Sequence, residues 1–183
     1  EIKVAPYKAV EIDDLKAFID EALKQMMDKN CTRDKFSVRF KNIVDRYNAG
    51  GSENEDYYEQ LLQLIEDLKK ESERPNLMGL SEEELEIFDL LIKGKNLTKA
   101  EEQKVILSAK NLYKKLNENR SSLFVVDWYR DEQPKARVKK AIMETLDADL
   151  PDSYDKEVFI VKIDLLLNHF IDMAVQGYGW VAA

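Results

Sequence analysis

Few residues in this sequence of 183 have the types and spacing that catalysis requires. The triplet Glu102-Gln103-Lys104, with Asp89 upstream, resembles the carboxylate-and-lysine set of a metal-dependent nuclease. Such a set must converge from a sheet onto the metal, whereas this triplet lies inside a helical pattern directly after a helix-start signal. Because so short a match is common by chance, we predict no catalytic residue here.

A run of aspartates offers the best candidate metal ligands. The stretch DADLPDSYD places them at positions 147, 149, 152 and 155. A calcium loop needs a glycine at its sharp turn and a distal bidentate carboxylate, and Pro151 breaks that register. Helix capping and solvation explain these aspartates better, so we predict no metal site.

His169 and Cys31 are the remaining candidates for acid–base or nucleophilic chemistry. His169 is the single histidine, and the sequence pairs it with no serine or cysteine nucleophile. We expect a helix histidine that faces solvent or has its hydrogen bonds satisfied. Cys31 lies near a helix start, and a semi-buried thiol is favoured over an activated one. No glycine-rich phosphate loop is present, so we expect no cofactor in this chain.

A basic segment gives the strongest binding signal. Residues 104–140 contain ten Lys/Arg and four Asp/Glu, a net charge of +6, while the whole chain has a net charge of −8. Near the end of this segment, helical spacing predicts that several cations face outward together, opposite an apolar stripe and close to Trp128. The candidate DNA contacts are Arg130, Lys135, Arg137, Lys139 and Lys140.

Cations beside an aromatic ring suit phosphate contact, and they suit a protein interface equally well. No base-reading motif is evident, so we expect DNA binding that is weak, salt-sensitive and independent of sequence. A solvated mixture of charges is the alternative.

The sequence ends in the aromatic, apolar stretch AVQGYGWVAA. Two interpretations stay open for Tyr178 and Trp180. In one, the rings fold back and cap the helical core, with the glycines allowing a tight turn. In the other, they form an exposed anchor for a second subunit. Trp128, Tyr178 and Trp180 are therefore the candidate subunit-docking residues.

Apolar residues recur at helical spacing along most of the chain, which predicts an all-α fold. Helix-start signals include Thr32 as an N-cap, a capping box formed by Thr98 and Glu101, and Pro134 in a first turn. The expected helices cover residues 11–30, 32–48, 57–73, 80–94, 97–119, 134–146 and 155–175.

These helices should form a multi-helix orthogonal bundle. The run LFVV is β-prone, so one short extended segment or strand pair near 122–128 stays open. The stretch RPNLMG should stop a helix at Pro75 and Gly79, which predicts two parts, 1–75 and 76–183. The two parts either share one core or form two.

The composition bounds the cellular setting. One cysteine excludes an intramolecular disulfide and fits a reducing compartment. No apolar run approaches the roughly 20 residues that span a bilayer. We therefore expect a cytoplasmic protein without membrane contact. Because the sequence begins with Glu1, we interpret it as a fragment of a longer polypeptide or a processed form.

Several stretches together resemble the C-terminal region of the R (motor) subunit of type I restriction enzymes. They are FKNIVDRYNAG, LMGLSEEELEIFDLL, DEQPKARVKKAIMETLDADLPDSYDKEVF and MAVQGYGWVAA. The resemblance runs in order from about Phe36 to the end of the sequence. Within it, Ala136 to Ile142 and Gln176 to Trp180 match the family pattern.

The resemblance implies a part of an ATP-dependent, site-specific deoxyribonuclease that has no activity by itself. The nuclease and motor domains, with ATP and magnesium, lie upstream in that family. This region is associated with docking the motor onto the methyltransferase core, whose M and S subunits are the implied partners, and with nonspecific duplex DNA. A purely structural helical scaffold, or a protein-interaction domain without DNA contact, is the alternative. The acidity of the chain favours protein docking with a narrow basic strip.

Overall fold

The computed structural model describes residues 4–181, which fold into two compact units that meet in the sequence between Glu82 and Glu83. The sequence had placed the boundary at residues 75 and 76, inside a helix that continues beyond it. Each unit has its own apolar core, as helical domains of this size require.

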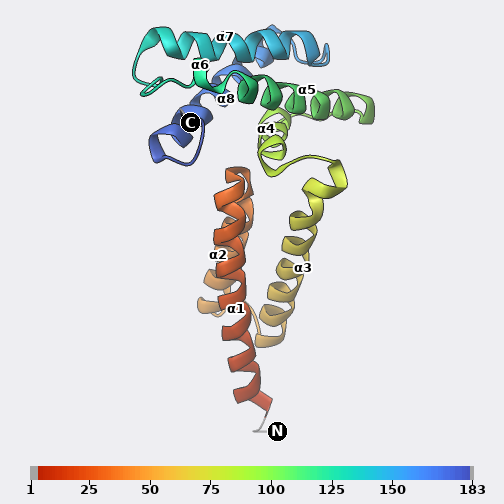
Figure 1. Ribbon diagram of the computed structural model, residues 1–183. Helices are drawn as coiled ribbons and strands as arrows, with labels where there is room; N and C mark the ends of the chain where they lie inside the picture. The colour runs from red at the N-terminus through yellow and green to blue at the C-terminus, as the bar shows by residue number, and fades with distance from the viewer. Residues whose placement is uncertain (1–3, 182–183) are drawn as a thin grey trace. The chain divides into compact units, whose positions relative to one another are not determined.

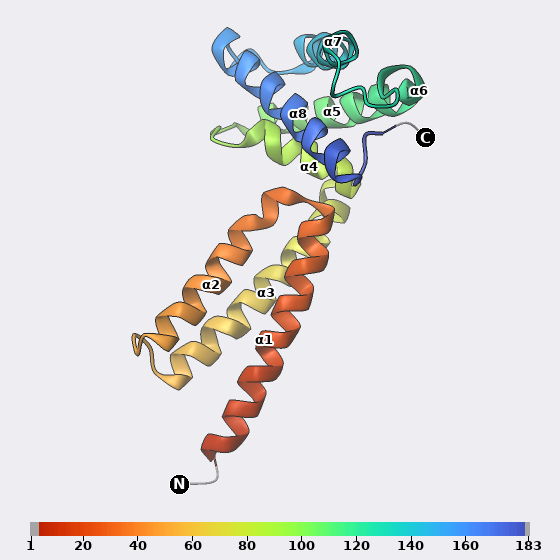
Figure 2. The same ribbon diagram turned by 90° about the vertical axis from the view of Figure 1, so that its left-hand side faces the viewer.

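The N-terminal unit is built on three long helices that run alongside one another (Figures 1 and 2). They are α1 (Val4–Lys29), α2 (Asp34–Asn48) and α3 (Asn54–Met78), with a single 3-10 turn, η1 (Cys31–Arg33), between the first two. Apolar residues spaced at helical periodicity meet in a shared core that includes Ile19, Leu23, Phe40, Leu61 and Leu64. Tyr47 and Tyr57 stack face to face, with their ring centroids 4.0 Å apart.

Two helix boundaries in this unit differ from the predictions. Thr32 is not an N-cap: the side chain of Asn30 caps η1 by accepting a hydrogen bond from the Thr32 N–H. Pro75 does not end α3, which continues to Met78. The helix ends at Gly79, whose left-handed backbone lets the Gly79 and Leu80 N–H groups bond back to Asn76 and Pro75.

The C-terminal unit contains the remaining helices. They are α4 (Glu82–Ile92), α5 (Lys99–Glu118), the short α6 (Arg120–Leu123), α7 (Glu132–Asp149) and α8 (Lys156–Gln176). Helix α5 lies alongside α7, and α8 crosses them (Figures 1 and 2). Residues 4–181 contain no strand, so the all-α prediction is confirmed. No helix in this range is both long and apolar enough to cross a bilayer.

The segment near 122–128 is the one place where a strand had been considered, and it forms α6 followed by a series of turns. Phe124 and Trp128 are both buried, with their rings packed edge to face. A strand here would have no partner strand among residues 4–181, whereas the observed turns place both rings in the core. Asp127 has a φ of +56°, which makes the turn tight enough to do so.

Local signals explain the ends of the other helices. The capping box of α5 is confirmed, since Thr98 accepts from the Glu101 N–H and Glu101 accepts from the Thr98 N–H. Pro134 occupies the first turn of α7, as predicted. Gly177 ends α8 in a left-handed conformation and turns the tail back toward the core.

Candidate functional site

The candidate nuclease residues do not converge. Glu102 and Lys104 are exposed on α5, whereas Asp89 is buried in α4. These groups lie on helices and have no sheet to aim them at a common metal. The geometry therefore gives this set no shared chemistry.

The aspartates of the α7–α8 connection have separate structural roles. Asp149 accepts a hydrogen bond of 2.9 Å from Asn111, which joins the end of α7 to α5. Asp155 caps α8 by accepting from the Val158 N–H at 2.9 Å. Asp147 and Asp152 are exposed. This distribution matches the expected capping and solvation.

His169 on α8 contacts a carboxylate of the same unit. Its Nε2 lies 2.7 Å from a carboxylate oxygen of Glu86 on α4, and both side chains are about nine-tenths buried. The pair joins α4 to α8, which is the satisfied arrangement expected for a helix histidine. Cys31 is exposed at the start of η1, not semi-buried as predicted.

The predicted DNA-contact residues do not share one face of the molecule. Arg137 and Lys140 are exposed and lie three positions apart on α7, or about 60° around the helix. Lys135 and Lys139 each lie about 160° around the helix from Arg137, at the other flank of the buried stripe, where they are only partly exposed. The buried arc of α7 contains the predicted apolar residues, and Thr145 is buried within it.

Most of these cations have an acidic partner. Lys139 binds Asp164 on α8 at 2.9 Å, and Lys135 binds Glu132 at 2.6 Å. The looser pairs are Arg130 with Asp127 at 3.5 Å and Lys140 with Glu144 at 3.7 Å. Exposed pairs of this kind contribute little to stability and exchange readily with other anions. Arg137 and Lys140 thus form the narrow outward part of the basic strip.

Two of the three predicted docking aromatics lie in the core of the C-terminal unit. Trp128 is 1% exposed and Trp180 is 8% exposed. Trp180 packs against Phe170, with ring centroids 4.5 Å apart, and against Phe124 at 5.3 Å. The Trp128 ring nitrogen donates to the Trp180 carbonyl at 2.7 Å. Trp180 therefore closes the core, as the capping interpretation describes.

Tyr178, unlike Trp180, is exposed to solvent. Its exposed fraction is 69%, although the backbone on either side of it is held by the end of α8 and by buried Trp180. A further bond from Arg120 to the Val181 carbonyl, at 3.3 Å, holds the tail beyond Trp180. The last two residues of the aromatic tail, 182 and 183, lie outside the described residues. Tyr178 is thus an exposed ring on a fixed backbone.

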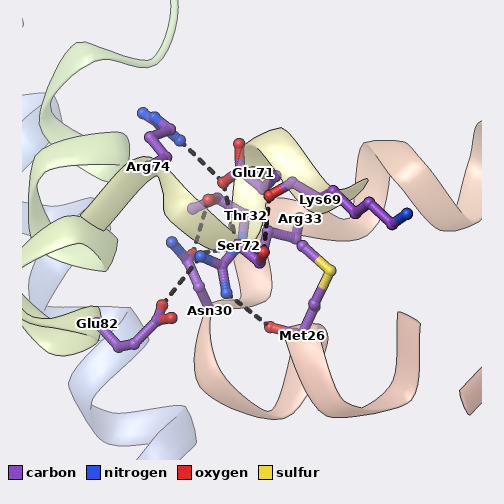
Figure 3. Close-up of polar contacts among 9 residues, drawn as sticks. All are labelled: Met26, Asn30, Thr32, Arg33, Lys69, Glu71, Ser72, Arg74 and Glu82. Atoms are coloured by element: carbon purple, nitrogen blue, oxygen red, sulfur yellow. Dashed lines mark hydrogen bonds and ion pairs between the residues drawn. The ribbon is translucent and has the colours of Figure 1, made fainter. Parts of the chain in front are cut away.

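A buried ion network in the N-terminal unit was missed by the sequence analysis (Figure 3). Arg33, 1% exposed, binds Glu71 of α3 through Nε at 3.1 Å and donates from Nη1 to the Met26 carbonyl at 3.3 Å. Arg74 binds the same Glu71 oxygen at 3.1 Å. Glu82 lies 2.9 Å from Arg33 Nη2, as an ion pair that lacks well-aligned hydrogen-bond geometry.

This network joins the turn between α1 and α2 to the C-terminal part of α3. Its charged groups bind one another and the Met26 carbonyl, so we assign the network a structural role. Arg33 and Glu71 are 38 positions apart, so no local spacing could have paired them.

Lys162 of α8 is a second buried cation that the sequence analysis missed. Its Nζ donates to the carbonyls of Leu90 and Lys93 near the C-terminal end of α4, where helix carbonyls lack intrahelical partners. Burial lowers the pKa of this lysine from its ordinary value, and the nearby charges of Lys93 and Lys95 lower it further. The contacts place Lys162 as a helix cap.

Comparisons with known proteins extend this description. The family model for the C-terminal region of endonuclease subunits like that of the type I restriction enzyme HindI matches residues 1–163. A putative type I restriction enzyme MjaIXP endonuclease subunit of Methanocaldococcus jannaschii is 27% identical over 146 residues, or 78% of this chain. The chain spans 14% of the length of that relative. No solved structure matches.

The matched region differs in extent from the resemblance noted in the sequence. It includes the residues before Phe36 and stops before the aromatic tail. The model nevertheless matches well over half of the chain. The chain therefore belongs to the family formed by the C-terminal regions of endonuclease subunits like that of the type I restriction enzyme HindI.

Proposed function

We propose that this chain is an assembly module of a type I restriction endonuclease subunit, which docks the nuclease and translocase parts onto the methyltransferase core. The exposed Tyr178 carries this proposal. An aromatic ring on a backbone already fixed by Trp180 loses little conformational entropy when a partner covers it. Val175, in the last turn of α8, is a second exposed apolar residue in this part of the sequence.

A narrow DNA contact on α7 is the second part of the proposal. Arg137 and Lys140 face outward together, and the pair that Lys140 makes with Glu144 is loose enough to yield to a phosphate. Two cations in an acidic chain support weak, nonspecific binding of duplex DNA, and they do not support a broad DNA groove.

The remaining roles belong to the rest of the endonuclease subunit. We propose that nuclease and translocase activity, with ATP and magnesium, reside in other parts of the endonuclease subunit, and that this chain has no activity by itself. The proposed partners are the M and S subunits of the complex, in the cytoplasm.

Co-purification tests the docking. The 183-residue chain would be mixed with the cognate methyltransferase core, with and without duplex DNA, as wild type and as Tyr178→Ala. We expect the variant to keep its melting temperature and lose most of its co-purification. Val126→Ala, at another exposed apolar position of the same unit, is the matched control and should bind as wild type. Full retention by Tyr178→Ala would reject Tyr178 as the anchor.

Fluorescence anisotropy with a labelled duplex tests the DNA contact. We expect binding that weakens as salt rises and that Arg137→Glu with Lys140→Glu removes. Lys114→Glu, a charge reversal at an exposed position of α5, should have a smaller effect. If the wild-type chain shows no salt-dependent binding, the DNA contact is rejected and docking alone stands.

A structural scaffold without DNA contact is the second candidate function. The burial of Trp128 and Trp180 favours it, because two of the three candidate anchors stabilise the unit internally. In that case surface substitutions at Tyr178, Arg137 and Lys140 would all leave assembly unchanged.

A further inference from the structure

A cationic groove lies along α2 in the N-terminal unit, on the side facing α3. It is open and has a volume of about 390 Å³. Six side chains line its walls: Lys35, Val38, Arg39, Asn42, Arg46 and Gln60. Five of them belong to α2, and Ile43, buried beneath them, forms the floor.

The spacing on α2 aligns the cations in a row. Positions 35, 39, 42 and 46 repeat every three or four residues, which is the spacing of one helix face. At a rise of 1.5 Å per residue, Lys35 and Arg39 lie about 6 Å apart along the axis, and Arg46 follows about 10 Å further on. The row therefore spans about three helical turns.

The groove is electropositive within an acidic unit. Residues 1–82 contain 18 Asp/Glu and 13 Lys/Arg, yet no carboxylate is among the described residues that line the groove. Such a concave surface concentrates the field of its few cations.

Two of the three cations are held in place. Asp67 of α3 binds Arg39 at 2.6 Å, and Gln63 braces Asp67 at 3.1 Å. Arg46 donates from Nε to the Gly51 carbonyl at 3.2 Å, which leaves the rest of its guanidinium for another acceptor. Positioned cations lose less entropy on binding an anion than mobile ones do.

Val38 identifies the kind of anion. It is 57% exposed and lines the groove together with the cations. A phosphodiester backbone offers no apolar seam to cover an exposed valine. A protein helix with an apolar seam and acidic edges complements both the valine and the cations.

We propose that this groove binds an acidic amphipathic helix of a partner protein, about three turns long. Its carboxylates pair with Lys35, Arg39 and Arg46, and its apolar seam covers Val38. The site belongs to the N-terminal unit and does not depend on the docking or DNA contacts proposed for the C-terminal unit.

The test uses the full 183-residue chain, labelled with nitrogen-15, and synthetic 18-residue helical peptides. The probe peptide carries leucine along one face and glutamate on both edges, and its comparison peptide has glutamine at every glutamate. We expect the glutamate peptide to shift the amide signals of residues 35–46 and the glutamine peptide to bind at least about tenfold more weakly.

Matched variants then test the site itself. Lys35→Glu with Arg46→Glu should weaken peptide binding by about tenfold or more. Val38→Ser should also weaken it, without any change of charge. Lys41→Glu, an exposed position on another face of α2, should leave affinity within about twofold. Circular dichroism confirms that each variant keeps its helix content.

With the peptides, the proposal is overturned if millimolar glutamate peptide causes no shifts, or if the glutamine peptide binds equally well. It is also overturned if Lys41→Glu loses as much peptide affinity as the groove variants. Finally, it is overturned if a 20-base-pair duplex, and not the peptide, shifts the signals of residues 35–46. Concentration-dependent shifts of these residues in the chain alone would assign the groove to a second copy and reject the partner helix. None of these outcomes bears on Tyr178 docking.

Discussion

The indole nitrogen of Trp128 donates a hydrogen bond of 2.7 Å to the backbone carbonyl of Trp180. The two residues are 52 positions apart, and the bond lies inside a cluster of rings that includes Phe124 and Phe170. It satisfies the one polar atom of a tryptophan that is almost completely buried. The same hydrogen bond fixes the tail that contains Tyr178. It therefore both covers the core of the C-terminal unit and positions the proposed docking residue.

Trp180→Ala should destabilise the C-terminal unit by about 3–5 kcal/mol, because it empties a ring-sized site in the core. Tyr178→Ala should change the free energy of unfolding by less than about 0.5 kcal/mol, since its ring is exposed. Urea unfolding followed by tryptophan fluorescence measures both, because the two tryptophans of the sequence, Trp128 and Trp180, both lie in this unit. Equal stability of the two variants would contradict the core role of Trp180.

Glu71→Ala should destabilise the N-terminal unit by about 3–5 kcal/mol, because it leaves buried Arg33 with an incompletely compensated charge. Urea unfolding followed by far-ultraviolet circular dichroism measures the change. The control is Glu66→Ala, which removes an exposed pair with Lys70 on the same helix and should have little effect. A small effect at both positions would show that the network is dispensable.

The ion pair of Asp67 with Arg39 should make the stability of the N-terminal unit depend on pH. The hydrogen bond from Arg39, and then that from Gln63, lowers the pKa of Asp67 from its ordinary 3.8. A carboxyl with a lowered folded pKa stabilises the fold fully above its unfolded pKa, and this contribution is lost as pH falls through the folded pKa. The difference in unfolding free energy between wild type and Asp67→Asn should therefore be largest near neutral pH and shrink below about pH 3.8. A difference that is constant with pH would exclude this linkage.

Lys162→Met should destabilise the C-terminal unit by about 1–3 kcal/mol, because the carbonyls of Leu90 and Lys93 lose their donor. Burial lowers the pKa of Lys162 in the fold, so the charged lysine costs stability below that folded pKa. As pH rises from the folded pKa toward 10.5, wild type should gain stability relative to the variant. Lys156→Met, at an exposed position of α8, supplies the control for urea unfolding at several pH values.

The helices themselves were predictable because each depends on short-range spacing of apolar residues. The capping box at Thr98 and Glu101 followed from two residues three positions apart. The end of α3 was placed too early, because the helix accommodates Pro75 and continues to Met78. At η1 the sequence analysis named Thr32 as the cap, whereas the side chain of Asn30 caps the turn by accepting from the Thr32 N–H.

The candidate site was predictable only where it depends on one helix. The outward position of Arg137 and Lys140 follows from the buried stripe of α7. The partners of Lys139 and Arg33 lie on other helices, 25 and 38 positions away, and helical periodicity contains no information on such pairs. Tyr178 is exposed and Trp180, two residues later, is buried, because the tail contacts Phe170 and Trp128 at Trp180. These contacts are between residues far apart in the sequence, so local spacing does not predict them.

The distance in sequence between Trp128 and Trp180 has a consequence during synthesis. The ring cluster that begins with Phe124 stays incomplete until Trp180 has left the ribosome, whereas the three-helix unit before it can already fold. For the few seconds in which those residues are added, Phe124 and Phe170 lack their covering ring and are open to wrong contacts. Nascent chains stalled with a C-terminal linker long enough to place residue 180 outside the ribosome should therefore resist proteolysis better than chains whose residue 180 is still inside it.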